Sequence, residues 1–500
     1  MDRPKLKQEL TFLRRVTSLD KFFKISERGS NVRTEIIAGL TTFFAMAYIV
    51  VTNPNQIVSF NHLAPDADPV FQQIWNAVYV ASILAAVIGT LLMALYAKMP
   101  FAQACGMGLN SFFFVSFILP EIIACGDGPI VGDNIIKGYH AGLVIILVSG
   151  IVFMIFSLTG LRAKVAKALP DCLKKAIPAG IGLFIAFIGF QNVGIIQANQ
   201  YTLVQFVDIH GAITSEEGII TVLPALLALL GLLVIAILEK FKVKGSVLIS
   251  IAGVTVLYYI LSGTTPSFDM SQVGQTFSDF GKIGITGVFS GDAWARAFTG
   301  EEIGGIFSAI MLVVTFCLVD MFDTIGTLYG TAAQADMLDK NGDPINVNQC
   351  MTSDSIATVA GAVCGTSTCT TYVESAAGVA AGGRTGLTSL VVAICFVICL
   401  FLSPFASLVP ACATAPALIY VGVLMLKGFA KVDMHDITSA VPAFLALVMM
   451  PLTYSISNGI GIGAIAYVII TLCTGKYQKK DIPITIIAAL FVIKFIFVTM

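Results

Sequence analysis

Charged residues are scarce in this chain. Of 500 residues only 12% are charged, whereas 57% are apolar and the mean hydropathy is +0.89, a composition that excludes a soluble protein. Apolar runs of about 17 to 25 residues recur, each long enough to cross a bilayer. These runs lack the alternation of a membrane β-barrel, so we expect helices, which satisfy their own backbone hydrogen bonds in lipid. The expected class is an all-α polytopic membrane protein.

The chain also lacks the spacings of metal sites and catalytic centres. Its 11 cysteines lie mostly within apolar runs without paired metal spacing, and we interpret them as small packing residues. The four histidines are expected in loops or near span ends, and none is spaced from another as a ligand pair: His62, His140, His210 and His435. We therefore expect no catalytic residue, no metal and no cofactor, and we do not expect an enzyme.

The apolar runs predict fourteen spans. They lie at about 34–53, 74–97, 103–118, 138–159, 173–195, 219–238, 244–262, 302–325, 352–365, 370–381, 386–405, 411–428, 437–456 and 459–475. The apolar tail 482–498 is either a fifteenth span or an alternative last one.

Lysine and arginine are unevenly distributed among the loops. They gather in residues 1–30, in 160–175 and in 240–244, whereas 54–73 and 196–218 contain none. Because cytoplasmic loops carry the excess of positive charge, the first three segments are expected on the cytoplasmic side. The stretch before Asn31 is polar and basic, unlike a signal peptide. The expected location is the inner or plasma membrane, with a cytoplasmic N-terminus.

Weak internal similarity indicates a repeat. Residues 220–229 (ITVLPALLAL) match 438–447 (TSAVPAFLAL) at an offset of 218, and an offset of 272 matches Gly89, Ala104 and Gly106 with later small residues. Seven spans is an odd number, so a second copy would be inverted relative to the first, as in many secondary transporters. Chance similarity among apolar, glycine-rich helices is the alternative.

The expected third and tenth spans are short, polar and rich in glycine. They read FAQACGMGLNSFFF (101–114) and GTSTCTTYVESAAGVAAGG (365–383), and the threonine-rich stretch Thr366–Thr371 of the second favours an extended chain. We expect each to form a strand followed by half a helix, and the two to pair at membrane depth. The N-termini of the half helices would then face a common site. The alternative is that small residues here only allow close helix packing.

Carboxylates inside the expected spans point to function, because a charge at the bilayer centre costs about 3 kcal/mol or more. Asp320 and Asp323 are three residues apart on one helical face, and Glu374 begins the half helix of the tenth span. A carboxyl group in a partly dry cavity can exchange a proton near neutral pH. Asn110 offers donors and an acceptor for a heterocycle, or an interhelical hydrogen bond. A structural role for Asp323 is as plausible as substrate contact.

Four segments together carry a family resemblance: ERGSNVRTEIIAGLTTFFAMAYIVVTNP, GMGLN, VDMFDTIGTLYG and TTYVESAAGVAAGGRTGLTS. From about residue 25 onward the chain resembles the AzgA-like purine permeases, a branch of the nucleobase-cation symporter-2 superfamily. The resemblance implies symport of adenine, guanine or hypoxanthine with protons. By position, Asn110, Asp320 and Glu374 match the family's functional residues. Related uracil carriers have a histidine where this chain has Thr324, which weakens a proton-relay role there.

The resemblance also implies an organisation in two inverted seven-span repeats, each with core and gate parts. The expected divisions are a cytoplasmic segment 1–30, core 31–160, gate 161–265, an extracytoplasmic loop 266–300, core 301–406 and gate 407–500. Expected substrate-binding residues are Gly108, Asn110, Asp320, Tyr372, Glu374 and Ser375. Expected proton-coupling residues are Asp320, Asp323 and Glu374.

The expected partners are a purine nucleobase, protons and the lipid bilayer, with no nucleic acid and with a homodimer left open. Transport of uracil, xanthine or an inorganic anion on the same fold is the alternative. A pocket with two or three carboxylates disfavours the anion.

Overall fold

The computed structural model describes residues 18–58, 68–124, 132–159, 170–214, 218–265, 270–300, 305–334, 337–339 and 344–497. Most of the expected loop at 160–175 and part of the expected extracytoplasmic segment at 266–300 lie outside these residues.

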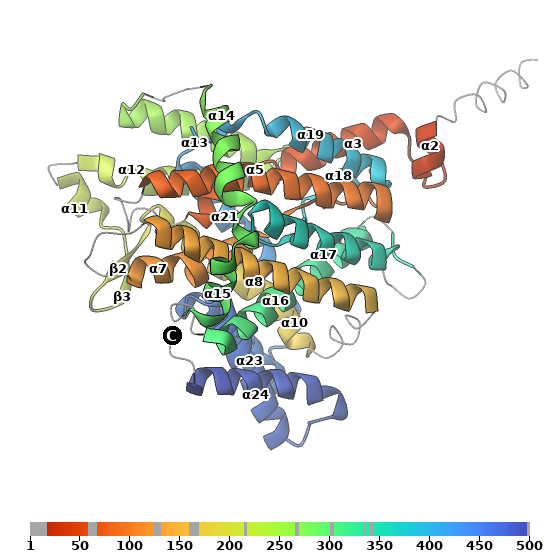
Figure 1. The fold of residues 1–500 in the computed structure, drawn as a ribbon, viewed down its shortest axis with the longest axis vertical. Helices are drawn as coiled ribbons and strands as arrows, with labels where there is room; N and C mark the ends of the chain where they lie inside the picture. Colours follow the sequence, from red (N-terminus) through yellow and green to blue (C-terminus); the bar gives the residue numbers. More distant parts are fainter. Residues whose placement is uncertain are drawn as a thin grey trace, which may run out of the picture.

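Long apolar helices dominate the first half of the chain (Figure 1). The helices are α2 (Ser18–Phe23), α3 (Val32–Met46), α4 (Ile49–Ile57), α5 (Asp68–Leu92), α6 (Met107–Phe113), α7 (Leu119–Ala124), α8 (Gly132–Thr159), α10 (Asp171–Asn192), α11 (Ile209–Thr214), α12 (Leu223–Lys240) and α13 (Ser246–Ser262). Single π-turns extend α5 at Met93–Ala97 and join α6 to α7 at Phe114–Ile118.

The second half has the same character. Its helices are α14 (Gln272–Asp279), α15 (Gly291–Thr299), α16 (Gly305–Gln334), α17 (Val347–Cys364), α18 (Ser375–Ala380), α19 (Gly386–Cys399), α20 (Ser403–Ala406), α21 (Ala411–Leu426), α22 (Ile437–Leu452), α23 (Ile456–Cys473) and α24 (Ile482–Phe497). The strands of the chain are β1 (Gln103–Cys105), β2 (Ile196–Asn199), β3 (Leu203–Phe206) and β4 (Cys369–Thr371).

Within the described residues, nine helical segments are long and apolar enough to cross a membrane. Three more apolar helices are shorter: α13, α19 and α22. The chain is therefore a multi-pass, mostly helical membrane protein, and a helix occupies part of each of the fourteen ranges expected from the sequence.

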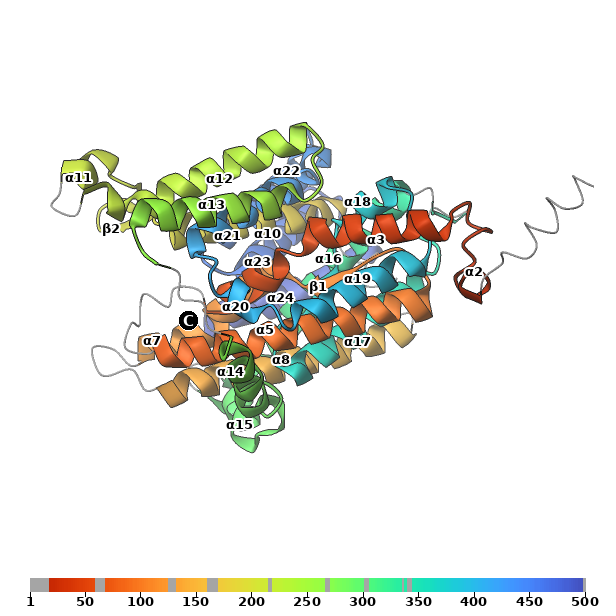
Figure 2. The ribbon, with the colours of Figure 1, turned by 90° about the horizontal axis from the view of Figure 1, so that it is seen from above.

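The helices pack in two groups. In one, α3, α5 and α19 lie together and α8 packs on α16 and α17; in the other, α10 packs on α21 and α22, and α12 on α13 and α21. Figure 2 shows α12 and α13 on one side of the molecule and α8 and α17 on the opposite side. Small residues allow close approach, because a Cβ on Gly182 would lie 2.9 Å from the carbonyl oxygen of Gly422.

The strands expected in the third and tenth spans are present and pair with each other. β1 and β4 are antiparallel, with Gln103 opposite Thr371 and Cys105 opposite Cys369. Their flanks also pair, since the N–H of Tyr372 donates to the carbonyl of Ala102 at 3.0 Å. Buried extended chain is tolerated here because each strand satisfies the other's backbone groups. The expected strand pairing is confirmed.

The offset of 272 does not match these strands to each other. It places Ala104 of β1 on Ala376 inside α18, whereas the first residues of the strands, Gln103 and Cys369, are 266 positions apart (369 minus 103). Alanine and glycine are frequent in the segments around these strands, so matching a few small residues did not determine which residues of the two segments are structurally equivalent.

The segments expected as polar loops contain structure of their own. β2 and β3 form a hairpin with Ile196 opposite Phe206, and α14 and α15 lie between α13 and α16. The bidentate ion pair between Arg296 of α15 and Glu121 of α7 joins α15 to the bundle, with Nε 2.7 Å from Oε1. This pairing of distant residues could not be read from local sequence.

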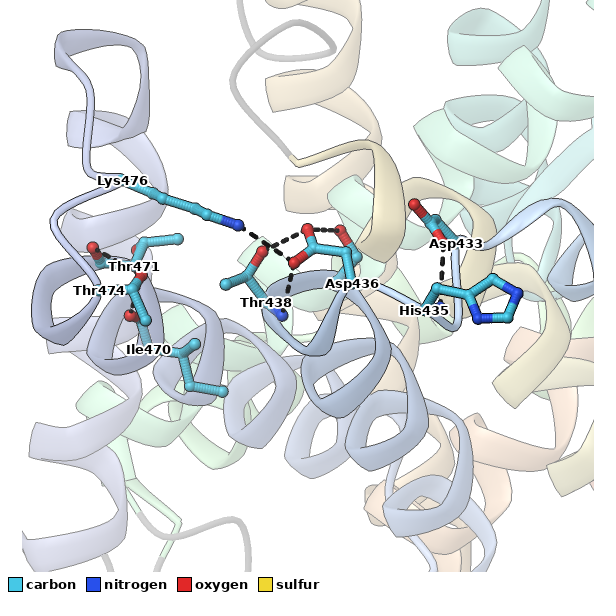
Figure 3. Close-up of polar contacts among 9 residues, drawn as sticks. Asp433, His435, Asp436, Thr438, Ile470, Thr471, Thr474 and Lys476 are labelled. Carbon is cyan, nitrogen blue, oxygen red and sulfur yellow. Dashed lines mark hydrogen bonds and ion pairs between the residues drawn. The ribbon is translucent and has the colours of Figure 1, made fainter.

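A polar cap fixes the start of α22 (Figure 3). The Asp436 carboxylate accepts hydrogen bonds from the hydroxyl and backbone N–H of Thr438, and the Lys476 ammonium lies 3.2 Å from its Oδ1. The Thr438 hydroxyl, followed by Lys476, lowers the pKa of Asp436 from 3.8 to about 2. A depressed pKa stabilises the folded state above the ordinary pKa, and this contribution is lost as the pH falls toward 2.

We therefore expect Asp436→Ala to lower the thermal midpoint of the purified protein by a few degrees at pH 7. Asp436→Asn should lose less, because asparagine is an equally good N-cap. Thermal melts between pH 3 and 7 measure this, and the gap between wild type and Asp436→Ala should narrow toward pH 3. Equal midpoints for wild type and Asp436→Ala at pH 7 would show that the cap contributes nothing.

Candidate substrate site

A cavity of about 350 Å³ lies where the two half helices begin. One wall is the start of α6 (residues 106–109) together with the chain from β4 into α18 (residues 370–374). The opposite wall comes from α10 and α21, including Ile181, Ile185 and Val421. The volume falls in the range of small-molecule sites, about 300–1,000 Å³. The two short segments singled out in the sequence thus share one cavity.

Glu374 supplies a carboxylate to this cavity. It is the residue that precedes α18, and its Oε1 accepts a hydrogen bond of 2.6 Å from the hydroxyl of Tyr48 in α4's N-cap position. Tyr48 lies between α3 and α4, far from Glu374 in the sequence. Tertiary packing therefore orients the carboxylate. Four acceptor positions on a carboxylate leave room for a ligand N–H beside the tyrosine.

Three more of the expected residues line the cavity: Gly108, Asp323 and Tyr372. The Tyr372 hydroxyl donates to the carbonyl of Cys105, which connects the segment between β4 and α18 to β1. Gly108 is required for packing, because a Cβ there would come within 2.3 Å of Ile181. Asp323 brings a second carboxylate from α16.

Asn110 and Ser375 do not line this cavity. Asn110 is fully buried, donates to Oε1 of Gln56 at 3.1 Å and accepts from the hydroxyl of Ser367. The hydroxyl of Ser375 accepts from the backbone N–H of Ala102 at 3.0 Å. Both side chains hold the half helices to neighbouring segments, which is the interhelical role that the sequence left open for Asn110.

Asp320 also lies outside the cavity wall, one helical turn before Asp323. It is 1% exposed, its Oδ2 lies 2.8 Å from the Thr358 hydroxyl, and its Oδ1 has no partner among the described residues. The Thr358 oxygen also lies 3.0 Å from the carbonyl of Cys369 and 3.1 Å from its N–H. Asp320 is therefore linked through one hydroxyl to strand β4.

The single proton of the Thr358 hydroxyl makes this link sensitive to the state of Asp320. When Asp320 is ionised, the hydroxyl donates to it and the carbonyl of Cys369 loses that bond. When Asp320 is protonated, it can donate to Thr358, which then donates to Cys369. Protonation of Asp320 thus changes a hydrogen bond on the strand that leads to Glu374.

The structure adds a carboxylate that the sequence reasoning missed. Asp354 of α17 is fully buried and accepts from the side chains of Gln103, at 2.9 Å, and Thr324. Thr324 also shares a hydrogen bond with Thr370 of β4, at 2.9 Å. Asp354 lies in the expected span 352–365, so the argument that a charge inside the membrane is costly, which drew attention to Asp320, could also have identified Asp354. Thr324, the departure from the uracil carriers, thus joins Asp354 to the paired strands.

Within the described part of the chain, no three His, Cys, Asp or Glu residues are grouped as a metal site would require. The polar side chains that line the cavity are the carboxylates of Asp323 and Glu374, the hydroxyl residues Thr327, Thr370, Thr371 and Tyr372, and the lysines Lys174, Lys175 and Lys431. The carboxylates can accept hydrogen bonds from ligand N–H groups, and the hydroxyls can donate to or accept from ring atoms.

Residues 33–462 match a family whose description is Permease family. The chain belongs to this permease family. It is 37% identical to the adenine permease AdeQ of Escherichia coli (strain K12), over 96% of this chain and 97% of AdeQ. It is 39% identical to the guanine/hypoxanthine permease PbuG of Bacillus subtilis (strain 168), over 95% of this chain and 99% of PbuG. The chain is thus a transporter and not an enzyme.

Solved structures show the same fold at low sequence identity. The transmembrane domain of a cyanobacterial bicarbonate transporter, BicA, superposes with a TM-score of 0.56 at 17% identity, covering 86% of this permease and 97% of that domain. At this identity the likeness concerns the fold of the permease alone.

Proposed function

We propose that this permease imports purine nucleobases, adenine, guanine or hypoxanthine, by proton symport. The observation that carries the proposal is the Glu374 carboxylate at a cavity between two half-helix starts. An ionised carboxylate accepts hydrogen bonds from the ring N–H groups of a purine, and such charge-assisted bonds are the stronger kind. Relatives that are more than 35% identical over nearly their whole length are named adenine and guanine/hypoxanthine permeases.

The proposed architecture is fourteen spans in two inverted repeats. Residues 31–160 and 301–406 form the core, and 161–265 and 407–500 form the gate. The packing of α8 with α16 and α17, and of α10 with α21 and α22, supports this division. Because the cavity has β4 and α6 on one wall and α10 and α21 on the other, movement of core against gate would expose it to alternate sides.

The proposed orientation has a cytoplasmic N-terminus in the inner or plasma membrane. Three lysines line the cavity mouth, Lys174, Lys175 and Lys431, and loops rich in positive charge face the cytoplasm. On this orientation the cavity opens inward in the conformation described.

An inorganic anion is the rival substrate on this fold. The three lysines favour an anion, but two of them have other partners: Lys174 pairs with Asp171 at 3.2 Å, and Lys175 donates to the carbonyl of Lys431 at 2.8 Å. Deeper in the cavity an anion would meet the carboxylates of Glu374 and Asp323. Repulsion there favours a neutral base over an anion.

Uptake of a radiolabelled purine into cells that lack their own purine carriers tests the proposal. We expect uptake that falls with an uncoupler and is unaffected by replacing sodium, because buried carboxylates in the membrane can take up and release protons. Unlabelled bicarbonate or sulfate should not compete, and unlabelled uracil and xanthine should compete weakly. Sodium-dependent uptake that survives collapse of the proton gradient would overturn the coupling.

A further inference from the structure

The permease has a second, larger cavity at the other end of the α4 helix. Its volume is about 560 Å³, within the range of small-molecule sites. It lies between α4 and α5 on one side and the end of α10 and start of α21 on the other. Its walls include Asn55, Gln56, Val58, Pro69, Phe71, Gln72 and Trp75, most of them in the segment 54–73 that has no lysine or arginine. By the charge rule this is the extracytoplasmic end.

The chemistry of this second cavity matches a planar heterocycle. Trp75 and Phe71 contribute aromatic rings, and Asn55 and Gln56 contribute amides. The indole of Trp75 is held in place, because its N–H donates to Oδ1 of Asn55 at 2.6 Å and its ring stacks on Tyr79 at an interplanar angle of 15°. A fixed aromatic wall with amide donors and acceptors beside it suits a nucleobase better than a chain-like or charged solute.

One amide oxygen at this cavity has no hydrogen-bond partner among the residues that the structure describes. The Oδ1 of Asn192, at the end of α10, is buried and accepts no hydrogen bond from the described residues. A buried acceptor without a donor is costly, so a ligand N–H reaching it is favoured. Gln72 adds a further, exposed amide to the wall.

A hydrogen bond connects the wall of the outer cavity to the helix that begins at the inner cavity. Gln56 lines the outer cavity, and its Oε1 accepts the Asn110 amide of α6, the helix whose first turn lines the inner cavity. The Asn110 oxygen in turn accepts from Ser367, just before β4. Gln56 of the outer cavity wall is therefore bonded to the groups that hold the half helices together.

We infer that this outer cavity is a second nucleobase-binding subsite, where a purine stacks on Trp75 and hydrogen-bonds the amides of Gln72 and Asn192 before it reaches Glu374. The inference rests on the proposed function for the identity of the ligand. In the described conformation, the hydrogen-bonded pair of Gln56 and Asn110 would close this subsite on the side of the inner cavity.

The tryptophan content provides a direct probe. The chain has two tryptophans, Trp75 and Trp294, and Trp294 lines neither cavity. Trp294→Phe therefore leaves Trp75 as the sole indole, and stacking of adenine or hypoxanthine on it should quench its fluorescence. Quenching should persist at the same purine concentration after adding Glu374→Gln. Adding Asn192→Leu or Gln72→Ala should raise the half-quenching concentration about two- to tenfold.

Two results would contradict the proposed outer subsite. If quenching follows Glu374→Gln and ignores both outer substitutions, Trp75 reports only on the inner site. If purine uptake by Trp294→Phe is normal but no quenching occurs, the outer cavity does not hold the base. Failure of the proposed function is separate, because it appears as absent purine uptake in the wild-type permease. Gln72 is exposed, so Gln72→Ala serves if Asn192→Leu does not fold.

Discussion

Glu374→Gln is expected to weaken purine binding by about ten- to a hundredfold, the cost of roughly 1.5–3 kcal/mol for losing one charge-assisted hydrogen bond. The substitution keeps the shape of the side chain, removes its charge and replaces one acceptor oxygen with an NH2 donor. The carboxylate lies on the cavity wall, with its Oε1 already bonded to Tyr48. Isothermal titration of the purified permease with adenine, guanine and hypoxanthine measures the effect.

Two matched variants sharpen this experiment. Tyr48→Phe leaves the carboxylate but removes its hydrogen bond, so a smaller loss of affinity is expected than for Glu374→Gln. Asp323→Asn removes the other carboxylate of the cavity. If Asp323→Asn abolishes binding while Glu374→Gln leaves it unchanged, Asp323 and not Glu374 accepts the purine N–H.

Asp320→Asn is expected to leave purine binding nearly intact but to abolish accumulation of purine above the external concentration. Asp320 lies behind the strand pair rather than on the cavity wall, so its charge does not contact the ligand there. Its link through Thr358 to the backbone of Cys369 changes when the carboxyl gains a proton. Asparagine cannot make that exchange, so the pH dependence of binding should flatten.

Transport assays in membrane vesicles that contain the permease distinguish loss of purine binding from loss of proton coupling. Purine exchange without a gradient should continue in Asp320→Asn, whereas uphill uptake driven by an imposed proton gradient should not exceed equilibration. Thr358→Val should uncouple in the same way, and Thr358→Ser, which keeps the hydroxyl, should behave as wild type. The roles of the two carboxylates are reversed if Asp320→Asn loses binding while Glu374→Gln keeps it and loses only the pH response.

The sequence predicted well those features that depend on local pattern. Apolar runs of bilayer length predicted the helices. The short, glycine-rich and polar character of 101–114 and 365–383, with the threonines of the second segment, predicted β1, β4 and the half helices after them. A strand and a helix each impose their own spacing and residue preference on a short stretch of chain, so one sequence is enough. The hairpin of β2 and β3 was missed because the segment 196–218 has no apolar run long enough to span a membrane and was therefore expected to be a loop.

The sequence did not predict which groups the buried polar side chains contact. Asp320 and Asp323 were expected on one helical face, yet Asp323 lines the cavity and Asp320 bonds Thr358 behind it. Asn110 bonds Gln56, which is the interhelical role that the sequence left open, and its contact with substrate stays a prediction. Asp354 received no role from the sequence, although it lies among Gln103, Thr324 and Thr371.

The sequence by itself determined that this protein is helical, crosses the membrane several times, and carries carboxylates and broken helices there, because these properties follow from composition and from neighbours along the chain. Only the tertiary structure decided which carboxylates reach a cavity and which are enclosed. Glu374 depends on Tyr48, and Asp320 on Thr358, and each pair joins elements distant in sequence. Hydrogen bonds act over about 3 Å, so their partners are set by packing between elements, which local periodicity does not encode.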